Sequence, residues 1–449
     1  MSDLDRQFIA DELLRCSRCG YCMSVCPTFA VGRDERAVAR GRNELVRRAL
    51  AGGARELAEL RGPLNDCLLC GACRTACFGC VETADVMARA RSIWQDEHGL
   101  PLVQRVAFRD VLANPPLMRH LMRLVSLGYA VGLRELVSRL PGLRSVSPSL
   151  DNARQMVPEM PRRFLRDSLP ELGFVPGSGP LGDVWMLAGD LSDGPKALYF
   201  LGCGADYQLP RQGEAAIRLL KRFSSCVIVA ANRCCGLPPY AYGDLEGAAQ
   251  LIQANVETIS TAGADVVVSE CASCSGFMRK WPELLAGTAA EQASHQLLSV
   301  TRDLTRFLAE QDWGPVESAL EGISVTFHDP CHLSRGQGIG EEPRKLLRDV
   351  ARMDFREMPE ADWCCGGAGT YAVTHPQTSD RILERKVRNI ESTGAKLVCT
   401  ACPACIAQLR RGVSRDQQGP GVQHIAETLC EALNIPLSSW QKQKEKPDG

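Results

Sequence analysis

The first hundred residues carry apolar side chains at helical spacing. Leu4 to Leu14 forms one such stretch, and Asp34 to Leu60, rich in Ala, Arg, Glu and Leu, forms a longer one. A third stretch runs from Glu82 to Glu97. Apolar residues that recur every three or four positions predict amphipathic helices. We therefore predict an α-helical domain over residues 1–100.

From about residue 195, short apolar runs alternate with helical stretches, and the whole alternation occurs twice. The corresponding elements lie 128 to 131 residues apart: 197–201 and 323–327, 213–222 and 343–350, 245–261 and 378–393, and 262–269 and 393–400. Strands that alternate with helices predict a small parallel α/β domain. We expect two copies of it, over 195–318 and 319–435.

The segment 101–194 predicts a helical or linker region, and 436–449 predicts a polar tail. Leu117 to Leu140 is amphipathic, with Leu, Met and Val on one side and Arg on the other. Packing against the chain's own domains is the favoured interpretation, with docking on a membrane surface or a partner as alternatives. Gly177 to Gly182 matches the letters of a dinucleotide fingerprint. Prolines precede and interrupt it and a strand-like run follows, so we interpret it as a linker.

Composition and charge describe a globular protein with no general affinity for nucleic acid. The 449 residues are 45% hydrophobic and 23% charged, with a net charge of −1. This length suggests two to four domains. The charge is uneven, because residues 1–166 contain 25 Arg, no Lys and 18 acidic residues, whereas the remainder is acidic. A basic N-terminal part suits anionic groups, although solvated charge on separate domains explains it equally well.

The beginning of the chain and its thiols predict a location. Residues 1–6 are polar and no apolar run typical of a signal peptide follows. The most hydrophobic candidate span, 117–137, is interrupted by three arginines and a glutamate. Free thiols in the number found here, 22, indicate a reducing compartment. We expect the protein in the cytoplasm or on the cytoplasmic face of a membrane.

Eight cysteines form two motifs of nearly identical spacing near the N-terminus. They are Cys16, Cys19, Cys22 and Cys26, followed by Pro27, and Cys67, Cys70, Cys73 and Cys77. Three thiolates at this spacing converge on one 4Fe–4S cubane, and the fourth typically serves the other cluster. We therefore expect Cys16, Cys19, Cys22 and Cys77 around one cluster and Cys67, Cys70, Cys73 and Cys26 around the other. Gly20 and Gly71 would allow the tight backbone path.

Zinc and covalent haem are the alternatives for these motifs. Two Cys-x2-Cys halves could form a tetrahedral zinc site, but zinc does not explain eight thiolates at triple spacing. No Cys-x2-Cys in the chain is followed by His, which excludes covalent haem. Phe78 stands where Pro commonly follows the second motif, and Cys80 lies two residues on. Cys80 could be a substitute ligand, although a buried thiol is the favoured interpretation.

Each α/β copy contributes five further cysteines. The sets are Cys203, Cys234, Cys235, Cys271 and Cys274, and Cys331, Cys364, Cys365, Cys402 and Cys405. An ordinary cubane needs four ligands and explains adjacent cysteines poorly. Cys226, Cys399 and Cys430 lie in apolar stretches and are expected to be small buried side chains. His332 could hydrogen-bond a cluster sulfur or relay a proton, but a structural role is favoured over both.

The repeat is similar to the paired-cysteine, or CCG, domain of heterodisulfide reductase and of iron–sulfur subunits of flavin-linked dehydrogenases. With two ferredoxin motifs in front, the layout resembles the iron–sulfur subunit of glycolate oxidase and of related lactate and glycerol-3-phosphate dehydrogenases. The resemblance covers residues 10–98 and 195–430. It implies that each five-cysteine set can hold a non-cubane 4Fe–4S cluster.

The same resemblance implies a function. Electrons would pass from FAD on a partner dehydrogenase subunit, through this chain, to a quinone or another carrier, with no catalytic residue in the chain itself. The substrate would be a 2-hydroxyacid of the glycolate or lactate type. Two alternatives share the motif inventory: a catalytic subunit that reduces a disulfide, as in heterodisulfide reductase, and an adaptor to another flavoprotein.

Overall fold

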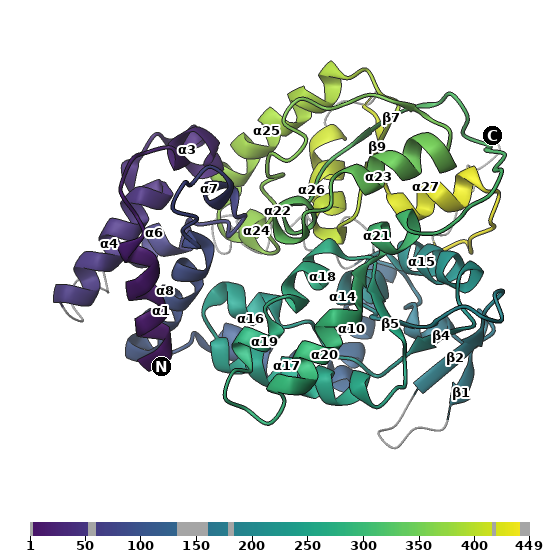
Figure 1. Cartoon of the computed structure of the whole chain (residues 1–449), viewed down its shortest axis with the longest axis horizontal. Helices are drawn as coiled ribbons and strands as arrows, with labels where there is room; N and C mark the ends of the chain where they lie inside the picture. Colours follow the sequence, from purple (N-terminus) through teal and green to yellow (C-terminus); the bar gives the residue numbers. More distant parts are fainter. Residues whose placement is uncertain (1–2, 53–59, 133–159, 178–183, 415–418, 441–449) are drawn as a thin grey trace.

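The computed structural model describes residues 3–52, 60–132, 160–177, 184–414 and 419–440. Figure 1 shows a helical N-terminal lobe beside two α/β lobes, one built mainly from the teal and one from the green to yellow part of the chain. The predicted fold class, a helical ferredoxin-like domain followed by a duplicated α/β domain, is confirmed.

The N-terminal domain is a small bundle with a core of its own. Its main helices are α1 (Asp3–Leu14), α4 (Ala39–Gly52), α6 (Arg61–Asn65) and α8 (Thr83–His98). Ile9, Val46 and Val86 are fully buried in this core. Short elements lie among the thiols, and α2 and α7 contain Cys22 and Cys73: α2 (Cys22–Val25), α3 (Pro27–Gly32), η1 (Glu35–Ala37) and α7 (Ala72–Thr75).

The long helix predicted over 34–60 is wrong at its start. The Asp34 side chain accepts a hydrogen bond from the Arg36 amide at 2.9 Å, which caps the short 3-10 turn η1 instead. Val38 is then extended, so the helix begins at Ala39 and is described as far as Gly52. Asp favours such local bonds to its own backbone over helix interiors.

The first α/β unit has a six-stranded sheet in the order β1-β2-β4-β3-β5-β6. Its strands are β1 (Val175–Gly177), β2 (Val184–Ala188), β3 (Lys196–Tyr199), β4 (Cys226–Val229), β5 (Val266–Ser269) and β6 (Thr301–Asp303). The strands β4, β3, β5 and β6 are parallel, while β2 pairs antiparallel with both β4 and β1. Two strands from the segment 101–194, predicted as a helical or linker region, therefore extend this sheet.

The second α/β unit repeats the central part of that sheet. Its order is β10-β9-β7-β8 and every pair is parallel. The strands are β7 (Ser324–Phe327), β8 (Asp354–Phe355), β9 (Leu397–Thr400) and β10 (Gly421–His424). The pair β7 and β9 corresponds to β3 and β5, as the repeat in the sequence predicts.

Helices cover both sheets and carry four of the ten CCG cysteines, Cys203, Cys274, Cys331 and Cys405. In the first unit they are α14 (Cys203–Tyr207), α15 (Pro210–Arg222), α16 (Leu237–Tyr242), α17 (Leu245–Ser260), α18 (Ala272–Met278), α19 (Trp281–Leu284), α20 (Glu291–Val300) and α21 (Leu304–Ala309). In the second they are α22 (Cys331–Gln337), α23 (Glu341–Lys345), η4 (Leu346–Val350), α24 (Tyr371–Thr374), α25 (Pro376–Ser392), α26 (Pro403–Val413) and α27 (Ile425–Ala432).

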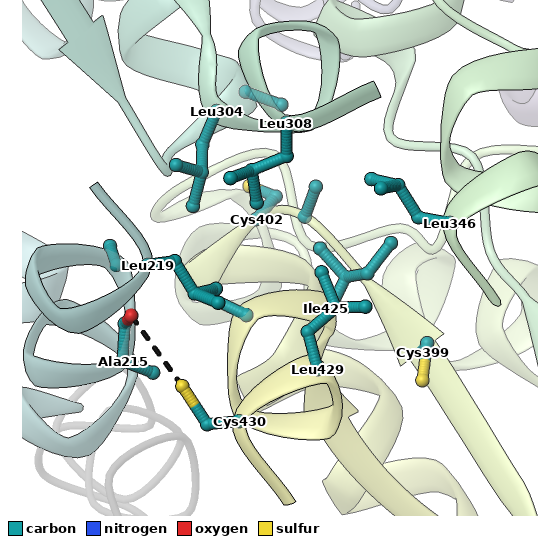
Figure 2. Packing of buried hydrophobic residues seen from close by; sticks show 14 of the residues in the cluster. Ala215, Leu219, Leu304, Leu308, Leu346, Cys399, Cys402, Ile425, Leu429 and Cys430 are labelled. Carbon is teal, nitrogen blue, oxygen red and sulfur yellow. Dashed lines mark hydrogen bonds between the residues drawn. The ribbon is translucent and has the colours of Figure 1, made fainter. Parts of the chain in front are cut away.

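One hydrophobic core joins the two α/β units. Figure 2 shows Leu219 of α15 and Leu308 of α21 facing Ile425 and Leu429 of α27, all fully buried. The Cys430 thiol donates to the carbonyl of Ala215 at 3.6 Å across this contact. Such shared burial holds the two units in a fixed arrangement, because separating them would expose apolar surface.

Three of the four cysteines outside the motif sets match the expectation of small buried side chains to different degrees. Cys399 and Cys430 are fully buried, and Cys226 is half-buried. Cys80 is exposed, which corrects the interpretation of a buried thiol. It occupies a left-handed turn (φ 48°) that leaves its side chain in solvent.

The described part of the predicted polar tail is ordered against the first unit. Trp440 Nε1 donates to Glu214 at 2.7 Å, and the Ser438 amide donates to the same carboxylate at 3.0 Å. The fingerprint-like segment 177–182 lies almost wholly outside the described residues, and Gly177 ends β1.

The amphipathic stretch forms helix α10 (Pro115–Ala130), and its residues 133–140 lie outside the described part. Within α10, only Ser126 is buried, and Leu124 and Leu127 are mostly exposed. Ser126 Oγ donates to the Pro161 carbonyl at 2.8 Å and Arg123 pairs with Asp167 at 3.0 Å, so α10 packs in part against the chain itself while these two leucines stay exposed. Among the described residues, no helix is both long and apolar enough to cross a bilayer.

We predict that Leu429→Ala lowers the free energy of unfolding by about 2–5 kcal/mol, because it opens a cavity in the shared core. The measurement is denaturant unfolding of the anaerobic protein followed by circular dichroism. Leu124→Ala is the matched control, since that side chain is 65% exposed. Equal unfolding midpoints for the two variants would contradict the shared core.

Candidate metal centres

The eight N-terminal thiols line two neighbouring cavities. Cys16, Cys19, Cys22 and Cys77 line one, and Cys26, Cys67, Cys70 and Cys73 line the other. The chain thus brings Cys26 to the second motif and Cys77 to the first, in the exchanged arrangement that the spacing predicts. Cys73 lies in the wall of both cavities, so the two sets are adjacent.

The glycine after the second cysteine of each motif occupies a left-handed conformation. Gly20 has φ 91° and Gly71 has φ 70°. Residues with a side chain rarely adopt this backbone shape, so the tight path between the thiols requires glycine.

The two ferredoxin-type sets differ in one thiol: the first includes the exposed Cys19 and the second the buried Cys26, and the other six are half-buried. Cys19 is exposed beside the rings of Tyr21 and Phe78, which meet edge to face at 5.0 Å. Hydrogen bonding from the Tyr21 amide lowers the pKa of Cys19. Burial raises the pKa of Cys73 well above its usual range, as expected for a thiol in a low-dielectric interior without its metal.

Two buried arginines flank the second ferredoxin-type set. Arg42 lines its cavity and donates to the carbonyl of Pro63 at 2.9 Å. Arg91 donates to the carbonyl of Cys67 at 2.7 Å. Both side chains belong to residues that are less than a tenth exposed. Guanidinium groups stay charged when buried, so they provide positive charge for an anionic group in this cavity.

The five thiols of the first CCG set lie at the carboxyl ends of parallel strands. Cys203 begins α14 after β3, and Cys234 and Cys235 follow β4. Cys271 follows β5, and Cys274 lies in α18. Ligand sites of parallel α/β sheets are found at this edge.

The second CCG set has the same placement. Cys331 begins α22 after β7, Cys364 and Cys365 precede α24, and Cys402 and Cys405 follow β9 and lie in α26. The Sγ atoms of Cys365 and Cys405 are 3.6 Å apart.

The glycine that follows each cysteine pair is explained by close packing. Gly236 and Gly366 have φ values of 94° and 83°. A Cβ atom at Gly366 would lie 2.8 Å from the carbonyl oxygen of Ser379, and one at Gly236 would lie 3.3 Å from that of Ala248. Each glycine lets a helix approach the loop that presents the paired thiols.

Thiols of three domains influence the pKa of one another in one continuous line. In order along the line, they are Cys203, Cys234, Cys235, Cys274, Cys271, Cys402, Cys405, Cys365, Cys364 and Cys70. The contact between Cys271 and Cys402 joins the two CCG sets. The contact between Cys364 and Cys70 joins the second CCG set to the ferredoxin domain.

The thiols in this line perturb one another strongly. Hydrogen bonds from Cys364 and Cys271 lower the pKa of Cys365 and of Cys402, respectively. The pKa of Cys70 is raised, first by its hydrogen bond with Cys364 and then by burial. Thiols packed this closely cannot all ionise unless a cation neutralises them.

The domain contact that makes the line possible is specific. Tyr240 Oη donates to Asp85 of α8 at 2.7 Å, and Lys280 Nζ pairs with the same carboxylate at 2.5 Å. On the other side, Tyr371 Oη donates to the carbonyl of Asp66 at 3.2 Å. In Figure 1, α3 and α7 of the N-terminal lobe lie beside α24 and α25.

Several buried nitrogen atoms around the second CCG set lack an acceptor. They are both ring nitrogens of His328, Nε and Nη1 of Arg335, and Nε1 of Trp363. Unpaired buried donors are costly, so their presence indicates that an acceptor belongs there. Sulfurs of an iron–sulfur cluster would be such acceptors.

Sequence reasoning missed His328 and Arg335. A nitrogen of His328 and the sulfurs of Cys365 and Cys405 all lie within 4.8 Å of one another. His328 directly precedes Asp-Pro-Cys, and this position was the only available signal. His332, which was singled out, lies 3.8 Å from Cys331 Sγ and 3.4 Å from Ser273 Oγ through its Nδ1.

The donor set fits iron–sulfur clusters. Zinc sites bind four ligands each, which five-thiol groups exceed. Thiolates in adjacent sets, buried arginines and unpaired N–H groups together suit anionic clusters whose sulfurs accept hydrogen bonds.

Two family models match the chain in the same places. A 4Fe-4S dicluster domain matches residues 12–79, and a cysteine-rich domain matches 197–279 and again 325–410. The probable glycolate oxidase iron-sulfur subunit of Bacillus subtilis is 28% identical over 438 residues, covering 95% of both chains. The glycolate oxidase iron-sulfur subunit of Escherichia coli K12 is 27% identical, over 90% of this chain and 91% of that one.

A shorter relative matches as well. Lactate utilization protein A 2 of Bacillus cereus is 30% identical over 247 residues, which is 99% of its length and 53% of this chain. The chain belongs to the family of glycolate-oxidase-type iron–sulfur subunits. In this family the cysteine-rich repeats and the dicluster domain bind iron–sulfur clusters, and the chain is an electron-transferring subunit of an oxidoreductase.

Proposed function

We propose that this glycolate-oxidase-type subunit carries electrons from FAD on a partner dehydrogenase subunit to a quinone or another carrier. The partner would oxidise a 2-hydroxyacid of the glycolate or lactate type. Full-length similarity to glycolate oxidase iron-sulfur subunits supports the substrate class. This chain would contribute the conducting path and no catalytic residue.

The proposal assigns four clusters to the four thiol sets. Cys16, Cys19, Cys22 and Cys77 would hold one 4Fe–4S cubane, and Cys26, Cys67, Cys70 and Cys73 the other. The two five-thiol sets would each hold a CCG-type cluster. A bound iron–sulfur cluster supplies a centre that accepts and returns one electron at a time.

The observation that carries the proposal is the line of interacting thiols from Cys70 to Cys203, in which the Cys365 and Cys405 sulfurs lie 3.6 Å apart. Electron tunnelling falls steeply with distance, so centres held by contacting ligands exchange electrons readily. Of the eighteen thiols in the four sets, only Cys19 and Cys203 are exposed. The conducting path would therefore reach the surface at its two ends, where a donor and an acceptor can approach.

The residues of this chain hold and insulate that path. Gly236 and Gly366 let the helices close over the paired thiols. Arg42, Arg91 and Arg335 offset negative charge in the buried centres, which would otherwise oppose their reduction.

Iron content and partner-dependent reduction test the proposal. Anaerobically purified chain should contain about sixteen iron atoms, four for each of four clusters. Its cluster signals in electron paramagnetic resonance (EPR) should stay oxidised with glycolate alone and become reduced when the FAD subunit is added. Oxidation of glycolate or lactate by the isolated flavin-free chain, or a metal-poor colourless chain, would refute it.

A disulfide-reducing catalytic subunit is the second candidate, supported by the Cys271–Cys402 contact between the two CCG sets. Under that alternative, adding a heterodisulfide to the reduced protein should change the EPR signals of the CCG clusters. Under the electron-carrier proposal those signals should be unaffected.

A further inference from the structure

The two CCG sites have different surroundings although they arose by duplication. The cysteine offset of 128 residues in the first part of the repeat places Phe200 opposite His328 and Tyr207 opposite Arg335. The offset of 131 residues in the later part places Asn255 opposite Lys386. In each pair the second copy has a basic side chain where the first has a side chain that cannot carry a positive charge.

His328 is the donor that contacts the second set most directly. It is 1% exposed, and one ring nitrogen lies within 4.8 Å of the sulfurs of Cys365 and Cys405. After the hydrogen bonds from Cys364 and Cys405, its side chain further lowers the pKa of Cys365. Its counterpart Phe200 is fully buried, and its ring packs edge-on against that of Trp281, with 6.1 Å between the ring centroids. The first CCG set therefore receives no hydrogen bond from this position.

Arg335 brings a permanent positive charge between the second CCG set and the ferredoxin domain. Its charge acts on Cys331 and Cys364 of the CCG set and on Cys70 of the second ferredoxin-type set. Its side chain is 11% exposed, and Nε and Nη1 are buried without a partner. Tyr207 at the corresponding position is buried and neutral.

Lys386 adds a buried positive charge near the second set, because it interacts electrostatically with Cys365 and Cys364. It is fully buried in α25 and donates to the carbonyls of Glu360 at 2.6 Å and Ala361 at 3.1 Å. In the first copy, Asn255 instead bonds the backbone of the loop, donating to the Cys234 carbonyl at 2.9 Å.

Opposing charges do not cancel this difference. Arg335 Nη2 pairs with Asp362 at 2.8 Å, but that carboxylate is 56% exposed and hence screened by solvent. Beside the first set, Asp206 forms an ion pair with Arg166 at 3.5 Å, which neutralises its charge. Arg233, next to Cys234, is partly exposed.

We propose that His328 and Arg335 tune the second CCG cluster to a higher reduction potential than the first. Hydrogen bonds to cluster sulfurs and nearby positive charge stabilise the reduced, more negative state. The inference rests on the proposed function, because it requires clusters in both five-thiol sets. Electrons would therefore settle on the second CCG cluster, in the middle of the thiol line, before they reach the first.

Redox titration of the anaerobic full-length chain, followed by EPR, tests this order. Cys235→Ser and Cys365→Ser, each disabling one set, assign the two CCG signals. The second signal should appear at the higher potential. His328→Phe, which copies the residue of the first repeat, should lower the midpoint potential of the second CCG signal. At the wild-type midpoint, the ratio of reduced to oxidised cluster should fall about tenfold, which corresponds to about 59 mV for one electron.

Two further variants keep the test decisive if His328→Phe loses iron. Arg335→Gln should lower the midpoint of the second CCG signal and of the ferredoxin-type cluster that includes Cys70. Phe200→His should raise the midpoint of the first signal. Iron-loaded variants with unchanged midpoints, or a first signal at the higher potential in the wild type, would overturn the inference. A wild-type chain without iron would instead refute the proposed function.

Discussion

Cys70→Ser should stop electron flow through the chain while leaving its fold intact. Cys70 is the one thiol that lines the second ferredoxin-type cavity and also contacts Cys364 of the second CCG set. Its loss removes a ligand from one proposed cluster and, at the same time, the thiol link between that cluster's ligands and the second CCG set. The partner subunit should then reduce the CCG clusters no further than it does in a chain that lacks its ferredoxin-type clusters.

The measurement combines iron analysis, EPR and circular dichroism on anaerobic protein. The variant should lose up to about four iron atoms, one cluster's worth, and keep the helical signal of the wild type. Cys80→Ser is the matched control, since Cys80 is exposed and lies outside both N-terminal cavities. Full iron and wild-type reduction of the CCG signals in Cys70→Ser would show that the electrons take another path.

The sequence predicts the local parts of this site well. Spacing alone assigns Cys26 to the second motif and Cys77 to the first, and these thiols do line the same cavities. Likewise, apolar runs before Cys271 and Cys402 predict strands that end at these cysteines, and β5 and β9 do so. The strands follow from neighbours within one apolar run, which periodicity reports directly, and the exchange follows from the typical role of the fourth cysteine in paired ferredoxin motifs.

Contacts between distant segments could not be predicted in this way. Cys70 and Cys364 are brought together by the docking of α7 and α3 against the second α/β unit, and no local pattern encodes that docking. The run that forms strand β2 is strand-like in the sequence, but its antiparallel pairing with β4 depends on a segment beyond β3 and could not be predicted from its own residues. His328 was overlooked for the same reason, because its value depends on Cys365 and Cys405 from other loops.

Gly243→Ala should loosen the ferredoxin domain from the first α/β unit. Gly243 ends α16 with φ 88°, and a Cβ atom there would lie 2.6 Å from the backbone carbon of Arg91 and the amide nitrogen of Ser92 in α8. Backbone atoms of a helix cannot yield locally, so α8 must move away as a whole. Overpacking of this kind costs about 1–3 kcal/mol.

This movement would disturb the bonds that Tyr240 and Lys280 make to Asp85 and, with them, the register of Cys70 against Cys364. We therefore expect iron content near that of the wild type but slower partner-driven reduction of the CCG signals, measured by rapid-freeze EPR. Gly263→Ala is the control that introduces backbone strain without a steric clash, because Gly263 has φ 65° and open space around it. It should cost about 1 kcal/mol of stability and leave the reduction rate unchanged. If both variants reduced at the same rate, tight docking of α8 on α16 would not be what holds the electron path together.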